Sequence, residues 1–322
     1  MTNYLKNKFL KKKLFRMIGV FIPFLFWIYF LYKQFESIKK YHWEISLTSF
    51  LWSIVFSSLY FITFSFNWSI ILKNISIRKS NDISVVKSMR AWLFTIMSRY
   101  VPGNVWHILG RMTFSDELNT GKTEIFTSSA IEQLVSLVGA TFVFFVSFPF
   151  WPLKIIGEGW IAKVGIIYVL FFSGLLILHP IFLRPVIRWL GEKLKRPEIQ
   201  WNLNYSEIIH FTLLYCISFL IMGLALIVLL KGFGQIVLPN FVYVIGCSAI
   251  AWVIGYISFI TPSGLGVREG TLAALLALMY PMPVAIVASL LFRIVCTIGE
   301  LIAILLFVIF LKLNKGSFFK KI

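Results

Sequence analysis

The chain has 322 residues, 59% of them hydrophobic, and a formal net charge of +18. Soluble domains contain roughly 45–50% apolar residues, so this composition excludes a soluble protein and predicts one integral membrane domain over residues 1–322. The basic excess does not indicate nucleic-acid binding, because the lysines and arginines lie beside apolar segments, where they orient the spans and contact anionic lipid.

The N-terminal region predicts two membrane spans. Six basic residues within 1–16 place the N-terminus in the cytoplasm, and the apolar run 17–32 then leads outward. No small-residue cleavage site follows this run, so we interpret it as a retained span rather than a signal peptide. The apolar run 45–72 is long enough to return across the membrane, and the basic loop after it lies inside.

The segment 83–118 is the first of two interrupted segments. It carries four basic residues and is broken by Pro102 and Gly103, so it is a poor full crossing. We expect it to enter the membrane from the cytoplasm and to return to the same side. The next apolar run, 125–153, contains Glu132 as its only charge and leads outward.

The second half is predicted to follow the same order with the opposite orientation. The span 164–183 leads to a basic cytoplasmic cluster, and the span 208–230 leads outward again. The long segment 232–280 is interrupted by a Thr-Pro-Ser-Gly cluster and is expected to enter the membrane from outside, before the span 284–311 returns to a basic tail. Treating both interrupted segments as full spans would put the basic cluster 184–196 outside, so we favour re-entrant segments. Full spans stay an open alternative, because the run 232–267 alone is long enough to cross.

The two halves also share residues at a constant offset. Six residues recur 160 positions later, with Ser98, Pro102, Gly110, Ser129, Val135 and Gly139 matched by Ser258, Pro262, Gly270, Ser289, Val295 and Gly299. We therefore predict an all-α polytopic membrane protein of two inverted repeats, about 14–153 and about 160–312, each with three transmembrane helices and one broken re-entrant helical hairpin. Such repeats place their breaks on either side of a binding site.

Both interruptions are expected to expose helix ends inside the membrane. Non-helical backbone is tolerated at that depth only where it is buried in protein or lines a water-filled cavity. Proline removes a donor and glycine permits unusual backbone conformations, so each break should begin a new helix whose free N–H groups favour an anion such as a phosphate head group. The alternative is a kink filled by neighbouring helices, but two breaks at the same offset favour a site.

Intramembrane charges lie close to both breaks. Ionisable side chains at this depth are costly, and their default interpretation is functional. We expect Arg268 to hold an anionic lipid phosphate, and Glu269 to hold either Arg268 or a cationic part of the head group. A structural ion pair is the open alternative for Glu132 and Glu300. The candidate substrate-binding residues are Arg99, Pro102, Gly103, Asn104, His107, Arg111, Glu132, Gln133, Pro262, Ser263, Gly264, Gly266, Arg268, Glu269, Arg293 and Glu300.

Three stretches resemble a known family. TPSGLGVREG (261–270) closely matches the Pro-x-Gly-Leu-Gly-Val-Arg-Glu signature of the lysylphosphatidylglycerol synthase transmembrane family, also called flippase-like, while SRYVPGNVW (98–106) and SSAIEQL (128–134) look like its first-half motifs. The resemblance covers nearly the whole chain. It implies the membrane part that, in larger relatives, translocates aminoacylated phosphatidylglycerol across the bacterial inner membrane. The matching motif positions are Pro102, Gly103, Glu132, Pro262, Gly264, Gly266, Arg268, Glu269 and Arg293.

The chain departs from the family pattern at two points. The family commonly has Arg after the Glu of its fourth segment, whereas this chain has Gln133, so an ion pair at that point is not carried over. The chain also stops soon after its last predicted span, so we expect the soluble aminoacyl-transferase domain of the larger relatives to be absent. On this interpretation the protein does not make lysyl-lipid by itself.

These features favour a lipid flippase or scramblase that moves an anionic, aminoacylated or glycosylated phospholipid-type substrate through a polar groove between the re-entrant segments. One alternative is a membrane-embedded enzyme of glycolipid synthesis, although the chain has only two aspartates and no Asp-x-Asp. Another is a non-catalytic partner of a lipid-modifying synthase. We expect a transporter rather than an enzyme.

The expected location is the bacterial inner membrane, with both termini in the cytoplasm. The expected partner is a membrane phospholipid or lipid-linked substrate, and a separate synthase and a homodimer are left open. Three cysteines and four histidines are scattered without the spacing of a metal or redox motif, so no metal or cofactor is expected. The many aromatic residues, 17% of the chain, are attributed mainly to lipid-facing and interfacial positions.

Overall fold

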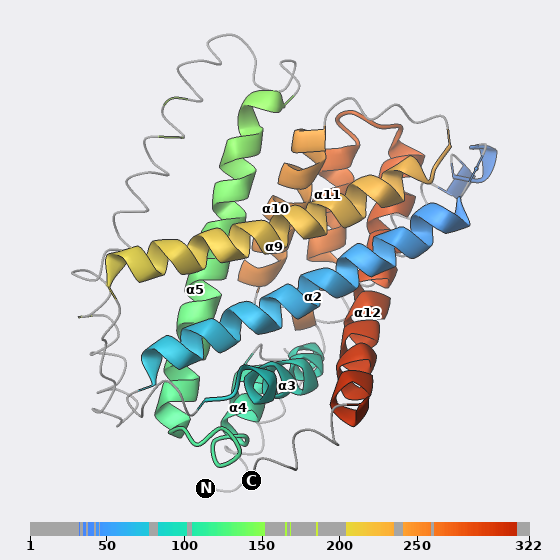
Figure 1. Ribbon diagram of the computed structural model, residues 1–322. Helices are drawn as coiled ribbons and strands as arrows, with labels where there is room; N and C mark the ends of the chain where they lie inside the picture. The colour runs from blue at the N-terminus through green and yellow to red at the C-terminus, as the bar shows by residue number, and fades with distance from the viewer. Residues whose placement is uncertain are drawn as a thin grey trace, which may run out of the picture.

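The computed structural model describes residues 43–44, 46–76, 83–101, 105–151, 204–234, 241–258 and 261–313, with scattered positions in 32–41 and 165–185. All regular structure within these residues is helical (Figure 1). The spans predicted at 17–32 and 164–183 lie outside the described residues.

Four of the described helices are long and apolar enough to cross a membrane: α2 (Leu47–Ile75), α5 (Lys122–Ser147), α9 (Tyr205–Lys231) and α12 (Met282–Leu313). A hydrocarbon core of about 30 Å needs roughly 20 helical residues, and each helix exceeds that length. Local caps fix where such apolar runs start. At the beginning of α9, for example, the Glu207 carboxylate accepts a hydrogen bond from the Asn204 backbone N–H at 2.7 Å. The spans predicted at 45–72, 125–153, 208–230 and 284–311 are confirmed as helices.

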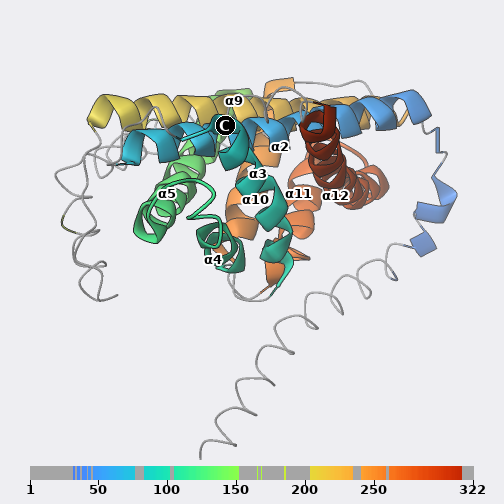
Figure 2. The ribbon, with the colours of Figure 1, turned by 60° about the horizontal axis from the view of Figure 1, so that its bottom comes forward.

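Helices α2 and α9 run antiparallel and form one layer of the molecule, with the other helices beneath it (Figure 2). The backbone N–H of Ser46, before α2, donates to the carbonyl of Gly232, after α9, at 2.8 Å. Further along, the Asn67 side chain donates to the Leu214 carbonyl at 3.1 Å and to Ser218 Oγ at 3.1 Å. Hydrogen bonds from backbone and side-chain groups thus join α2 to α9. In lipid no hydrophobic force drives two helices together, so such bonds contribute to their association.

Each of the other two long helices, α12 and α5, approaches this layer closely at one glycine. A Cβ added at Gly299 of α12 would lie 2.5 Å from the Ser57 hydroxyl of α2. A Cβ added at Gly139 of α5 would lie 3.1 Å from the Thr212 carbonyl of α9. Small residues permit such close helix crossings in membranes. Because α12 packs against α2 and α5 against α9, each half of the chain contacts the other half.

The second interrupted segment is broken where the sequence predicts, and in the first the described helices end before and begin after the predicted break at Pro102 and Gly103. The first comprises α3 (Val85–Ile96), a 3₁₀ turn η1 (Met97–Tyr100) and α4 (Trp106–Met112). The second comprises α10 (Phe241–Ile257), η3 (Pro262–Gly264) and α11 (Val267–Leu276). The longest of these helices, α10, has 17 residues, which rise only about 25 Å at 1.5 Å per residue. The described helices of both segments are therefore shorter than a full crossing.

The order of helices repeats at the offset seen in the sequence. Helix α5 begins at Lys122 and α12 begins at Met282, 160 residues later. The helices α2, α3 and α4 have counterparts in the same order in α9, α10 and α11, whose first residues lie 156 to 161 positions later.

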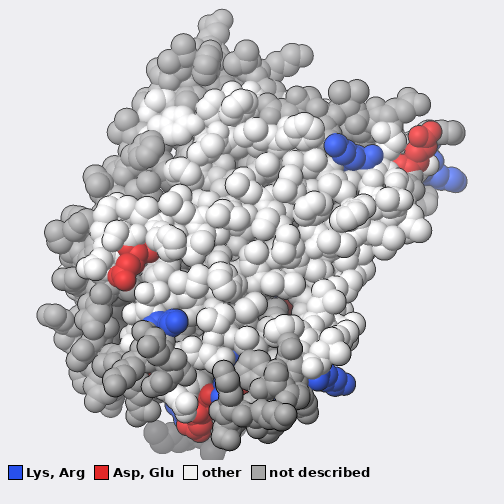
Figure 3. All heavy atoms as spheres, in the orientation of Figure 1, with Lys and Arg blue, Asp and Glu red and all other residues white. Residues whose placement is uncertain are grey.

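The outer face over α2 and α9 suits contact with lipid. In Figure 3 this face is uncharged across its centre, and the charged side chains lie near its margins. Along α9, exposed apolar side chains follow one helical stripe: Ile209, Leu213, Ile217, Leu220 and Leu224. A stripe of this spacing facing outward is expected of a helix bathed in hydrocarbon.

Candidate functional site

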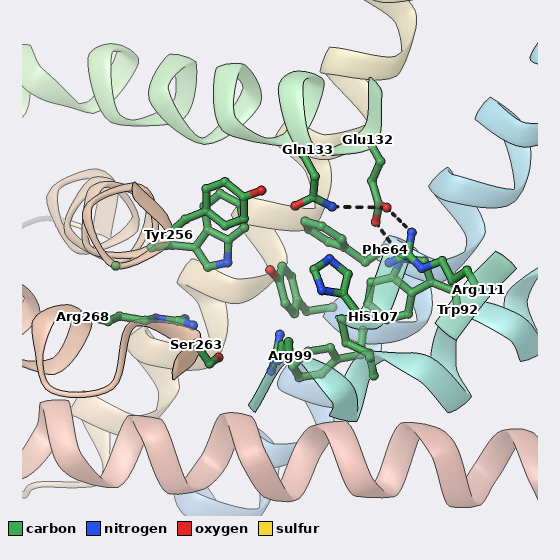
Figure 4. A pocket seen from close by; sticks show the side chains of 15 residues that line it. Phe64, Trp92, Arg99, His107, Arg111, Glu132, Gln133, Tyr256, Ser263 and Arg268 are labelled. Atoms are coloured by element: carbon green, nitrogen blue, oxygen red, sulfur yellow. Dashed lines mark hydrogen bonds and ion pairs between the residues drawn. The ribbon is translucent and has the colours of Figure 1, made fainter. Parts of the chain in front are cut away.

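A cavity lined by aromatic and charged residues lies between the two interrupted segments and against α2 (Figure 4). It contains about 660 Å³ of space between atoms, its open side included. Side chains from both halves of the chain form its wall: Tyr60, Phe61, Phe64, Trp92, Ile96, Arg99, His107, Arg111, Glu132, Gln133, Trp252, Gly255, Tyr256, Ser263 and Arg268. The cavity is thus built where the two breaks of the chain meet.

One wall is held by a fully buried ion pair between Arg111 of α4 and Glu132 of α5. The two side chains are 0% and 1% exposed. Trp92 Nε1 donates to the other carboxylate oxygen at 2.6 Å, and the guanidinium lies 4.8 Å from the ring centre of Trp68. Gln133, the next residue, donates weakly to Glu132 at 3.4 Å. Charges at this depth need such partners, so the pair joins α4 to α5.

A second ion pair joins the 3₁₀ turn η1 in the middle of the first broken segment to α12. Arg99 of η1 donates to Glu300 of α12 at 2.7 Å, and the Tyr100 hydroxyl donates to the same oxygen at 3.0 Å. Glu300 is 0% exposed, whereas Arg99 is 18% exposed and reaches the cavity. Both Glu132 and Glu300 thus have an arginine partner in the structure, as expected if they form structural pairs.

The second break is shaped by backbone conformation. Ser263, Gly264 and Gly266 have φ values of 53°, 69° and 84°, all in the left-handed region. A Cβ at Gly264 would lie 2.6 Å from the Gly255 carbonyl oxygen of α10. Glycine is needed here both for its φ and for the contact with α10. This turn places Ser263 on the cavity wall and starts α11 beside α10.

Glu269 does not hold Arg268 in the structure. Its carboxylate accepts a hydrogen bond from the Gly266 N–H at 2.7 Å and lies 3.3 Å from Arg293 Nε. The first of these contacts caps the N-terminus of α11 from within the chain. The expectation that this helix start offers only free N–H groups to an anion is therefore wrong for Gly266, because Glu269 already occupies that donor.

Arg268 is the arginine of this region for which no acidic partner occurs among the described residues. It extends into the cavity from the side of α11 (Figure 4). Its described hydrogen-bond contact is with the sulfur of Met222 at 3.5 Å. Gly255 makes this placement possible, since a Cβ there would lie 2.8 Å from the Cβ of Arg268. A cation is thus presented to the cavity with no carboxylate of the described residues to compensate its charge.

Other polar atoms on the wall also lack partners within the described part of the chain. His107 of α4 is 5% exposed, and its Nδ1 makes no hydrogen bond there. Arg111, despite its bond to Glu132, keeps Nε and Nη2 unpaired. Buried polar groups normally have partners, so unpaired donors around one cavity indicate a polar ligand or ordered water.

The structure brings most predicted site residues together. Seven line the cavity directly: Arg99, His107, Arg111, Glu132, Gln133, Ser263 and Arg268. Three act from behind the wall through contacts to cavity or break residues: Glu269, Arg293 and Glu300. Pro262, Gly264 and Gly266 belong to the second break. Pro102, Gly103 and Asn104 lie outside the described residues.

The sequence did not predict the aromatic part of the wall. Tyr60 and Phe64 of α2, and Trp252 and Tyr256 of α10, face the cavity, although aromatic residues were attributed mainly to lipid contact. Since aromatic residues are frequent throughout the chain, composition carries no signal that separates these from the rest. Gly255 offered a clearer signal, as a glycine inside an apolar helical run indicates a close approach of another element.

The comparison with known families supports this description of the chain. The family described as "Lysylphosphatidylglycerol synthase TM region" matches residues 16–310. No curated protein and no solved structure gives a significant match. With the match extending over most of its length, the chain belongs to the lysylphosphatidylglycerol synthase TM family.

Proposed function

We propose that this protein is a lipid flippase or scramblase of the bacterial inner membrane, and a transporter rather than an enzyme. The observation that carries the proposal is the charged cavity between the two breaks, with Arg268 uncompensated in its wall, inside a bundle of membrane-length helices. Family membership supports a lipid-related membrane function.

The proposed route for the lipid follows from the difference between the charged cavity and the apolar outer face of the helices. A phosphate-bearing head group enters the polar cavity, where the planar Arg268 guanidinium donates two parallel hydrogen bonds to its oxygens. The acyl chains stay outside against apolar helix faces such as the stripe on α9. The paired arginines Arg99 and Arg111 keep the wall polar with little net charge. Lipid polar groups thereby avoid the hydrocarbon core.

The finer architecture is part of the same proposal. We propose that the halves are inverted repeats and that the broken segments are re-entrant, one from each side of the membrane. The antiparallel course of the equivalent helices α2 and α9 supports this arrangement. Inverted repeats place a substrate site near the membrane midplane between two discontinuous helices, and a cavity lined from both broken segments supports such a site here.

Two equivalent turns test the inversion. Asp116 follows α4, and Leu278 follows α11; both are exposed. In a background without the three buried cysteines Cys216, Cys247 and Cys296, we expect Leu278→Cys to react with an impermeant thiol reagent in intact cells. Asp116→Cys should react only after permeabilisation. Labelling of both from the same side would contradict the inversion.

Transport itself is tested by reconstitution. The purified protein is placed in liposomes with fluorescent phospholipids, and the loss of outer-leaflet fluorescence to a membrane-impermeant quencher is followed. We expect movement of labelled lipid between leaflets to be faster than in protein-free liposomes, and to fall toward that baseline in Arg268→Gln. Rates equal to protein-free liposomes for every lipid tested would overturn the proposed function.

A further inference from the structure

Each carboxylate at the cavity, or directly behind its wall, already has a cationic partner. These pairs are Glu132 with Arg111, Glu300 with Arg99, and Glu269 with Arg293. Arg268 adds a fourth guanidinium for which the described residues contain no carboxylate. With ordinary protonation this described cluster has a net charge of +1, so it is complementary to one negative charge.

The aromatic wall offers little to a cation either. The Arg111 guanidinium lies 5.3 Å from the ring centre of Trp92, and Trp252 and Tyr256 stack with ring centres 5.2 Å apart. A guanidinium thus already lies over Trp92, and one face each of Trp252 and Tyr256 is covered by the other ring. A head-group ammonium needs an available carboxylate or an open ring face, and this cluster would repel it.

The remaining polar atoms suit uncharged hydroxyl groups. Gln133 carries an amide that both donates and accepts, and His107 Nδ1 is unpaired among the described residues. Ser263 lies on the opposite side of the cavity from Gln133 (Figure 4). A head group with hydroxyls could bond to these neutral groups while its phosphate faces Arg268.

Resting on the proposed function, we infer that the cavity selects lipids with a single phosphodiester and an uncharged, hydroxyl-bearing head group of glycerol or sugar type. It discriminates against head groups that carry an ammonium. A lipid of net charge −1 neutralises the described cluster. A lysyl ester brings two further positive charges beside Arg99, Arg111 and Arg268, in a partly desolvated site where unpaired like charges are most costly.

The test compares head groups on matched acyl chains in the liposome assay. We expect phosphatidylglycerol to move at least about tenfold faster than its lysyl ester, with phosphatidylcholine between them, because like-charge contacts are strongly unfavourable in such sites. Equal rates for all three lipids, or fastest movement of the lysyl ester, would overturn the selectivity while leaving lipid transport intact. Failure of all three to move would refute the proposed function instead.

A charge reversal sharpens this comparison. In Arg268→Glu we expect phosphatidylglycerol movement to fall and the ratio of lysyl ester to phosphatidylglycerol to rise at least about tenfold. Lys122→Gln removes a positive charge from an exposed position at the start of α5, outside the cavity, and should leave the ratio unchanged. An unchanged ratio in Arg268→Glu, or an equal change in Lys122→Gln, would contradict selection at the cavity. The wild-type comparison stands even if the Arg268→Glu protein does not fold.

A soluble phosphate compound carries the same anionic group as the lipid and could also bind in the cavity. Uptake of radiolabelled glycerol 3-phosphate and inorganic phosphate into the same liposomes separates the two sources. We expect no uptake above protein-free liposomes, because the proposed substrate keeps its acyl chains in lipid. Uptake of either anion with no lipid movement would assign the cavity to a soluble anion and overturn the inference.

Discussion

The two breaks occupy equivalent places in the two halves but differ in the pairing of the arginines that line the cavity beside them. Near the first break, Arg99 and Arg111 are bound to carboxylates that come from outside the broken segment. At the second, left-handed backbone at Ser263, Gly264 and Gly266 sets the shape, and Arg268 remains without an acidic partner in the described chain. An ordered, paired charge stabilises the fold, whereas an unpaired one is available to a ligand.

From this difference we expect substitution of a paired charge to lower mainly the stability of the protein. Substitution of the unpaired Arg268 should lower mainly lipid transport. Arginines of similar depth are expected to behave differently because of their partners rather than their residue type. The following substitutions test that distinction, from the largest expected effect on stability to the smallest.

Removing the buried carboxylate of the first half should have the largest effect. Glu132→Ala leaves Arg111, which is 0% exposed, without its partner, and we expect a loss of about 3–5 kcal/mol in the free energy of unfolding. Thermal unfolding in detergent measures it. The double variant Arg111→Met, Glu132→Leu should recover much of the loss, since it removes both charges together. A single variant as stable as wild type would show that the pair does not hold α4 to α5.

A side chain at the second break should be next in size. Gly264→Leu forces a φ of 69° on a residue with a Cβ and directs that atom to within 2.6 Å of the Gly255 carbonyl. We expect the strain to cost about 1–3 kcal/mol, with further loss from the clash, and transport to be abolished. Gly121→Leu is the matched control, because φ there is −73° and an added Cβ has nothing nearer than 3.8 Å. Similar behaviour of the two variants would mean that the turn adapts freely.

Neutralising the carboxylate on α12 should have a smaller effect on stability. Glu300→Gln keeps the shape and can still accept from Tyr100, but loses the charge that holds Arg99. As Arg99 is 18% exposed and partly solvated, we expect a loss of about 1–2 kcal/mol in the free energy of unfolding. The unfolding midpoint of Glu300→Gln should therefore lie between those of wild type and Glu132→Ala. A loss equal to that of Glu132→Ala would remove the distinction between these two pairs.

Arg268 should show the opposite pattern to Glu132. Arg268→Gln removes no described ion pair, so the unfolding midpoint should change little, by about 0.5 kcal/mol or less in free energy. Lipid movement should nevertheless approach the protein-free baseline, and Arg268→Lys should restore only part of it, because a point charge lacks the planar fork. Normal transport in Arg268→Gln, with the protein folded, would place substrate binding elsewhere.

The long apolar runs and the two interruptions were predictable because they depend on local chemistry. A run such as 208–230 must satisfy its backbone internally in lipid and therefore forms a helix, observed as α9 (Tyr205–Lys231). Proline and glycine end helices by their own geometry, so the second break was expected at 261–264 and is observed there. The repeat at offset 160 likewise appears in the helix boundaries.

The partners of the charges were not predictable in this way. Glu269 lies next to Arg268 in the chain, yet its carboxylate contacts Arg293 and the Gly266 N–H. Adjacent residues on a helix do not face each other, and residue 293 comes close only through the packing of α11 against α12. Trp92, which donates to Glu132 from 40 positions away, gave no sign in the sequence that it belonged to the site.

By itself, the sequence determined the membrane class, the spans described as helices, the positions of the breaks and the residue types available for a site. These follow from transfer of each segment into lipid and from the backbone limits of proline and glycine. Tertiary structure decided which charges neutralise one another and which one is left over. That outcome depends on distances between helices far apart in the chain, since Arg99 and Glu300 are separated by 201 positions and lie 2.7 Å apart.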